Sequence, residues 1–99
     1  MARYKVMIDD NYHHTDEEYR YEKGVYETAA QALDVCREVV ERSVREGFAP
    51  GMPADELYRN YVAFGEDPFI IVLDGKDDSA NFSAWNYAKE LCRVVCGEN

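Results

Sequence analysis

The chain opens with residues 3–8, in which apolar and polar side chains alternate. A period of two is typical of a strand that buries one of its faces. Residues 19–26 are also rich in β-forming side chains, and Gly24 among them indicates a bulge or a close approach of two backbones. The two segments predict a hairpin whose strands are joined by a long loop.

A helical period of apolar positions follows and extends over residues 29–46. Thr28 stands three residues before Gln31, and this spacing predicts a capping box at the start of the helix. Gly47 is suited to the left-handed conformation that ends many helices, so we expect the helix to stop there.

Two shorter helices are predicted farther along the chain. The first covers residues 53–64 and places Tyr61 and Phe64 on its buried side. The second extends from residue 84 to about residue 96, with Ser83 as its N-cap.

Between these two helices, residues 68–73 form a continuous apolar run. Such a run predicts a strand that is covered on both faces and lies in the centre of the sheet. The elements together predict one α+β domain over residues 1–99, in the order β-β-α-α-β-α, with a mainly antiparallel sheet packed against helices.

The composition agrees with one small folded domain. The chain has 99 residues, and 46% of them are hydrophobic, which suffices for a core that needs no metal ion or disulfide to stabilise it. No run approaches the roughly 20 apolar residues of a membrane span, and the first residues lack the apolar stretch of a signal peptide. The three cysteines, Cys36, Cys92 and Cys96, are expected to be buried and reduced, although the last two are spaced to supply thiolates to a metal from one helix face. We therefore expect a cytoplasmic protein.

Charge bears on the choice of partner. Twenty acidic and eleven basic residues give a net charge of −9, which disfavours binding to nucleic acid or to an anionic membrane. A protein partner or a second copy of the chain fits this charge better, and an acidic mimic of nucleic acid is a further alternative.

Eight tyrosines are too many for a core of this size, so some must lie near the surface. Tyrosine is enriched in contact surfaces because it buries a large area at a small cost in side-chain entropy. The candidate interaction surface consists of Tyr12, Tyr19, Tyr21 and Tyr26; the alternative is that these residues border the core with their hydroxyls in water.

A second candidate is a ligand pocket at the start of the last helix. Aromatic and small polar residues are mixed there, and the pocket would be formed by Phe82, Trp85 and Tyr87. The alternative is a helix start that packs on the sheet.

The third candidate is a divalent-metal site or small hydrolase site in the loop of residues 9–18, the only cluster of carboxylates and imidazoles in the sequence. Its ligands would be Asp9, Asp10, His13 and Asp16. No known metal motif is satisfied, and the alternative is a solvated hairpin loop.

Catalytic motifs are missing from the sequence. Cys36 falls on the buried side of its helix, no serine lies in a nucleophile elbow, and no glycine-rich loop could hold a phosphate. We therefore expect no cofactor, and a protein that is not an enzyme.

Three segments carry a resemblance to a known family. They are residues 4–13 (YKVMIDDNYH), residues 64–69 (FGEDPF) and residues 82–92 (FSAWNYAKELC). Together they resemble a family of small bacterial proteins of unknown function. The resemblance covers nearly the whole chain and implies a bacterial protein with a single domain; it offers no catalytic residues to transfer.

Overall fold

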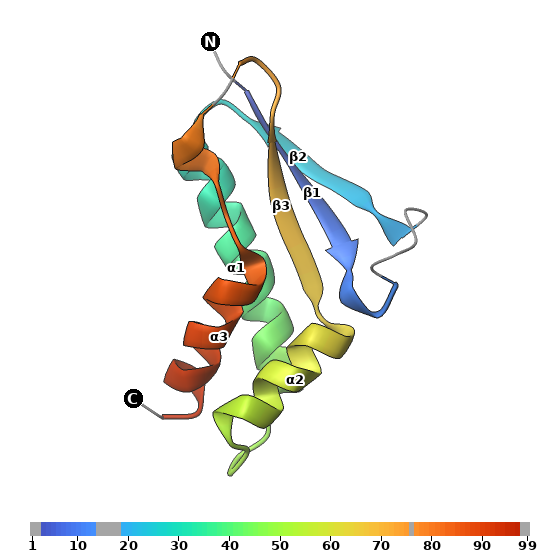
Figure 1. Ribbon diagram of the computed structural model, residues 1–99, viewed down its shortest axis with the longest axis vertical. Coiled ribbons are helices and arrows are strands. Elements are labelled where there is room, and N and C mark those ends of the chain that lie inside the picture. The colour runs from blue at the N-terminus through green and yellow to red at the C-terminus, as the bar shows by residue number, and fades with distance from the viewer. Residues whose placement is uncertain (1–2, 14–18, 76, 98–99) are drawn as a thin grey trace.

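The computed structural model describes residues 3–13, 19–75 and 77–97, without the side chains of His13 and Asp78. Its elements follow the predicted order and confirm the α+β class (Figure 1). They are β1 (Tyr4–Asp10), the 3₁₀ turn η1 (Asn11–His13), β2 (Tyr21–Tyr26), α1 (Ala29–Gly47), α2 (Ala54–Phe64), β3 (Glu66–Val72), the 3₁₀ turn η3 (Asp78–Ala80) and α3 (Ala84–Val95).

The three strands form one antiparallel sheet in the order β2-β1-β3, and the three helices lie on one side of it (Figure 1). The central strand is therefore β1, and the prediction that residues 68–73 form the central strand is wrong. Pro68 explains the difference. Because the Leu73 N–H donates to the Arg3 carbonyl, alternation turns the Pro68 nitrogen towards the free edge of β3, where no ladder hydrogen bond is lost.

The hairpin between β1 and β2 contains the predicted irregularity. Val6 pairs with Gly24 and Met7 pairs with Glu22, so Lys23 is the extra residue of a β-bulge. Gly24 lies beside it, and a Cβ added there would lie 2.7 Å from the Tyr26 hydroxyl, so a larger residue would require the Tyr26 ring to move.

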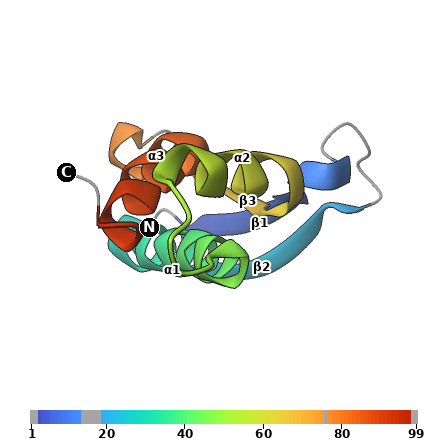
Figure 2. The same cartoon turned by 90° about the horizontal axis from the view of Figure 1, so that it is seen from below.

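The helix α1 connects the two parts of the core. Its Cys36 packs with Tyr4 and Val6 of the sheet, while its Val44 packs with the apolar faces of α2 and α3. Figure 2 shows this arrangement end-on, with α2 and α3 lying together and α1 beside the sheet. Within the part of the chain that the structure describes, no helix packs against the opposite face of the sheet (Figure 1).

The caps predicted for α1 and α3 are confirmed, whereas α2 begins at Ala54, one residue later than predicted, with Pro53 as its N-cap. Gln31 N–H donates to Thr28 Oγ1 at 3.1 Å, and the Gln31 side chain accepts from the Thr28 N–H, which completes the capping box. Ser83 Oγ accepts from the Asn86 N–H at 3.3 Å and caps α3. Gly47, in contrast, belongs to α1 and has no left-handed conformation, since Phe48 caps the helix instead.

Among the described residues, no helix combines the length and the apolar character needed to cross a membrane.

Candidate functional site

The side chains of a strand alternate between its two faces, and this separates two neighbouring aspartates at the end of β1. Asp9 pairs with Asp67 of β3 on the side away from the helices, whereas Asp10 pairs with Glu66 on the helix side. The structure therefore brings Asp9 and Asp67 together, although they are far apart in the sequence.

Asp9 and Asp67 line a surface groove of about 630 Å³ between β3 and the segment that leads into α3. We call it the Trp85 groove. Its lining consists of Asp9, Arg20, Asp67, Phe69, Phe82, Ser83, Ala84 and Trp85. This volume falls in the range of small-ligand sites, and the lining combines aromatic surface with a few charged groups.

Arg20 is held on the Asp9 side of the groove. Its Nε lies 2.6 Å from Asp9 Oδ1 and its Nη2 lies 3.2 Å from Asp9 Oδ2, which is a bidentate ion pair. The Arg20 Cζ atom also lies 5.2 Å from the centre of the Phe69 ring. The groove thus already holds one guanidinium between a carboxylate and an aromatic ring.

Asp67 has no such cation: within residues 3–13, 19–75 and 77–97, no ion pair joins its carboxylate. The side chain is partly buried, and this burial, followed by the nearby charge of Asp9, raises the pKa of the Asp67 carboxyl above its usual value. With Arg20 paired to Asp9, the charge left in the groove is the negative charge of Asp67.

A buried asparagine holds the aromatic end of the groove in place. The Asn11 side chain is 5% exposed, and its Nδ2 donates to the Tyr61 carbonyl at 2.9 Å. Its Oδ1 accepts from the Trp85 indole N–H at 3.4 Å, and its backbone N–H donates to the Gly65 carbonyl at 2.9 Å. Asn11 therefore joins the end of β1 to α2 and to the start of α3.

An exposed aromatic pair lies next to this junction. The rings of Tyr12 and Phe64 stack with centres 5.6 Å apart, and their side chains are 63% and 67% exposed. The prediction that Phe64 faces the core is wrong, because the last turn of α2 lies against η1 and turns Phe64 towards Tyr12. Three aromatic residues, Tyr12, Phe64 and Trp85, thus present exposed ring surface at this end of the molecule.

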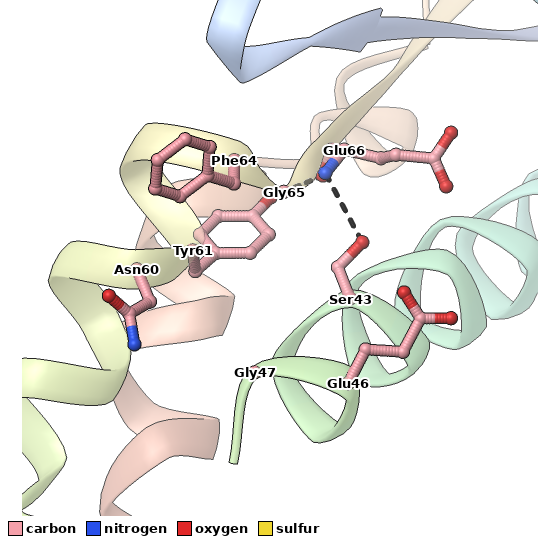
Figure 3. A pocket seen from close by; sticks show the side chains of 8 residues that line it. All are labelled: Ser43, Glu46, Gly47, Asn60, Tyr61, Phe64, Gly65 and Glu66. Atoms are coloured by element: carbon pink, nitrogen blue, oxygen red, sulfur yellow. Dashed lines mark hydrogen bonds between the residues drawn. The ribbon is translucent and has the colours of Figure 1, made fainter.

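A second hollow, of about 420 Å³, lies between α1 and α2 (Figure 3). Three hydrogen bonds connect Glu66 at its wall to the neighbouring elements. The Glu66 N–H donates to Ser43 Oγ at 3.2 Å, the Tyr61 hydroxyl donates to the Glu66 carbonyl at 2.6 Å, and the Tyr21 hydroxyl donates to the Glu66 carboxylate. These bonds hold the start of β3 against α1 and α2, and Ser43 Oγ takes part in them as the acceptor of a backbone N–H.

The four tyrosines of the predicted interaction surface do not share one face. Tyr12 of η1 stacks on Phe64 of α2, and Tyr19 is exposed just before β2. Tyr21 and Tyr26 both point to the helix side of the sheet, where Tyr26 packs on the core and the Tyr21 hydroxyl bonds to Glu66.

The residues predicted to bind a metal are not gathered by the part of the chain that the structure describes. Asp9 is paired with Arg20, and Asp10 Oδ1 accepts from the Tyr12 N–H at 2.9 Å on the other face of the strand. Asp16 and the side chain of His13 lie outside the described residues. Within those residues, no group of three or more histidines, cysteines and carboxylates could hold a metal ion.

The predicted ligand pocket is only partly reproduced. Phe82 and Trp85 line the Trp85 groove, whereas Tyr87 turns away and its hydroxyl donates to Glu41 of α1 at 2.9 Å. Cys36 and Cys92 are buried, as predicted, whereas Cys96 is only partly buried. Burial raises the pKa of the Cys36 thiol to about 12 and that of the Cys92 thiol to about 11.

Three residues of this region were missed at the level of the sequence. Arg20 and Asp67 meet Asp9 only through strand pairing, which the sequence alone does not give. The role of Asn11 could have been predicted, because a short polar side chain between a strand and a turn often forms hydrogen bonds with backbone groups.

The chain matches no family model, and no curated protein and no solved structure matches it.

Proposed function

We propose that this chain is a protein-interaction domain, and that the Trp85 groove binds a basic side chain of the partner. The observation that carries the proposal is Asp67: its carboxylate is partly buried in an aromatic groove and forms no ion pair with any described residue.

A cation in the groove would offset the two effects that raise the pKa of Asp67. It would supply charge that the buried carboxylate lacks, and it would balance the repulsion from Asp9. Arg20 illustrates the geometry, since it combines a bidentate ion pair with an aromatic contact. An incoming guanidinium would meet Asp67 and the Trp85 ring in a similar combination.

The surroundings of the groove favour a protein over a small amine. Tyr12 and Phe64 expose stacked rings at the same end of the molecule. Asn11, which precedes Tyr12 in the chain, accepts a hydrogen bond from the Trp85 indole. Exposed aromatic residues commonly supply most of the binding energy at protein interfaces. The net charge of −9 would also speed the approach of a basic partner.

The fluorescence of Trp85, the only tryptophan in the chain, reports on the groove. The test titrates the protein with a set of short arginine-containing peptides and with the same peptides carrying glutamate instead of arginine. We expect the basic peptides to change the Trp85 emission, with binding that weakens as salt is added.

Asp67→Asn should weaken this binding about tenfold or more, because a charge-assisted contact contributes roughly 1.5–3 kcal/mol. Asp74→Asn is the matched control, since it removes the same charge from an exposed turn outside the groove. Equal losses in the two variants, or equal binding of the glutamate peptides, would refute the proposal.

A further inference from the structure

A third hollow, of about 250 Å³, lies between α2 and α3 and shares no lining residue with the other two. We call it the Lys89 hollow. Ala54, Asp55 and Tyr58 of α2 line one side, and Lys89 and Arg93 of α3 line the other. Because residues four apart on a helix lie on one face, the two basic side chains leave α3 one turn apart on the same side. The hollow thus has two cations on its wall, in a chain whose net charge is −9.

Most of the wall of the Lys89 hollow is apolar. Ala54 is buried in the core between the helices, and the partly buried Tyr58 packs against the same core. Lys89 and Arg93 are exposed, and long basic side chains of this kind cover apolar surface with their methylene stems while their charged ends stay in water. A ligand in the hollow would therefore meet apolar surface together with positive charge.

The polar groups of the Lys89 hollow have donors that the described chain does not use. The Lys89 ammonium forms no ion pair with any described residue, and the Tyr58 hydroxyl forms no hydrogen bond with one. Arg93 Nη1 lies 3.8 Å from Glu90 Oε1, a long contact that leaves most of the five N–H donors of the guanidinium free for a ligand. An ammonium, a guanidinium and a hydroxyl group on one small hollow favour an anionic ligand.

Charge and size together restrict which anion fits. Asp55 Oδ2 lies 3.6 Å from Arg59 Nη1, one turn farther along α2, so the charge of Asp55 is only partly balanced. Asp55 would repel a dianion such as phosphate more strongly than it would repel one carboxylate. An apolar cavity of about 150 Å³ holds benzene, so a hollow of about 250 Å³ leaves room for an acid of the size of benzoate.

We infer that the Lys89 hollow binds a small organic acid that carries one carboxylate on an apolar body. The carboxylate pairs with Lys89 and Arg93, and the apolar body lies against Tyr58 and Ala54. Because the ion pairs are exposed to water and the ligand has few atoms, the affinity is in the millimolar range. The Trp85 groove takes no part in this site, since it would bind a cation and shares no lining residue with the hollow.

Titration of the ¹⁵N-labelled full chain with sodium benzoate, from about 0.1 mM to about 20 mM at constant ionic strength, tests the inference. The amide signals of Tyr58, Lys89 and Arg93 should shift along one common saturation curve. Benzamide has the ring without the charge, and acetate has the charge without the ring, so each should bind about threefold more weakly than benzoate or worse. Equal binding of benzamide or of acetate, or no shift of the three signals at the highest benzoate concentration, would overturn the inference.

Lys89→Met should weaken benzoate binding about threefold or more, because it removes the ammonium and keeps an apolar stem. Lys23→Met is the matched control, since Lys23 is exposed on β2 and lies outside the hollow. Arg93→Met, on the same face of α3, should repeat the loss if Lys89→Met disturbs the helix. Unchanged binding in both Lys89→Met and Arg93→Met, or an equal loss in Lys23→Met, would refute a carboxylate site in this hollow.

Discussion

Asp9 and Asp67 lie opposite each other across the β1–β3 ladder, but of the two only Asp9 has a cation paired with it among the described residues. Because of this asymmetry, Asp67 is the member of the pair with which a positively charged ligand could form an ion pair. It also has consequences for stability that can be measured without any ligand.

Asp67→Asn should stabilise the chain at neutral pH. The raised pKa of Asp67 means that the folded chain binds a proton more readily than the unfolded chain, so stability falls as the pH rises through that pKa. The variant removes this loss, and its advantage should disappear as the pH is lowered below the ordinary aspartate value of 3.8. Urea unfolding at neutral and acidic pH measures both effects.

Asp74→Asn provides the comparison for this experiment, because Asp74 is exposed and lies outside the groove. We expect it to have little effect at either pH. An Asp67→Asn chain that is less stable than the wild type at neutral pH would mean that the free carboxylate is already well stabilised, contrary to the account given above.

Asn11→Ala should destabilise the chain by about 1–3 kcal/mol, because it removes the hydrogen bonds that the buried Asn11 side chain makes to the Tyr61 carbonyl and to the Trp85 indole N–H. Asn81→Ala, at an exposed position, should change the stability by no more than about 0.5 kcal/mol. Chemical denaturation gives the two values, and similar losses in both variants would show that Asn11 does not hold this junction together.

Two glycines near the hollow between α1 and α2 should respond to alanine in opposite directions. At Gly65 an added Cβ would lie 2.5 Å from Tyr61 Cδ1 and 2.8 Å from the Tyr61 carbonyl oxygen, so we expect a loss of roughly 1–3 kcal/mol. At Gly47, the last residue of α1, the nearest atom is Leu57 Cδ1 at 3.6 Å, and alanine should stabilise the helix by up to about 0.5–1 kcal/mol. Thermal melting of the two variants decides this, and shifts in the same direction would contradict the packing described for these helices.

The elements of this fold were predictable because their signals are local. The alternation in β1, the Thr28–Gln31 capping box and the Ser83 cap each depend on residues only a few positions apart. The edge position of β3 could also have been predicted, because a proline within a strand indicates an edge strand. The prediction of a central strand gave more weight to the hydrophobicity of residues 68–73 than to Pro68.

The candidate site was much less predictable, because its geometry depends on distant pairings. Asp67 meets Asp9 through strand register, and Trp85 meets Asn11 across 74 positions of the chain. The tyrosine hypothesis depended on residue counts, whereas the positions of Tyr21 and Tyr26 depend on strand alternation and on the bulge between them.

Binding in the Trp85 groove can be observed residue by residue in a two-dimensional amide spectrum of ¹⁵N-labelled protein, recorded as one of the basic peptides is added. We expect the Trp85 indole signal and the amide signals of Asp67, Phe69 and Ser83 to shift together, and the same signals to stay in place in Asp67→Asn. Shifts spread over the acidic helix surfaces, or the same shifts in Asp67→Asn, would contradict a binding site in the Trp85 groove.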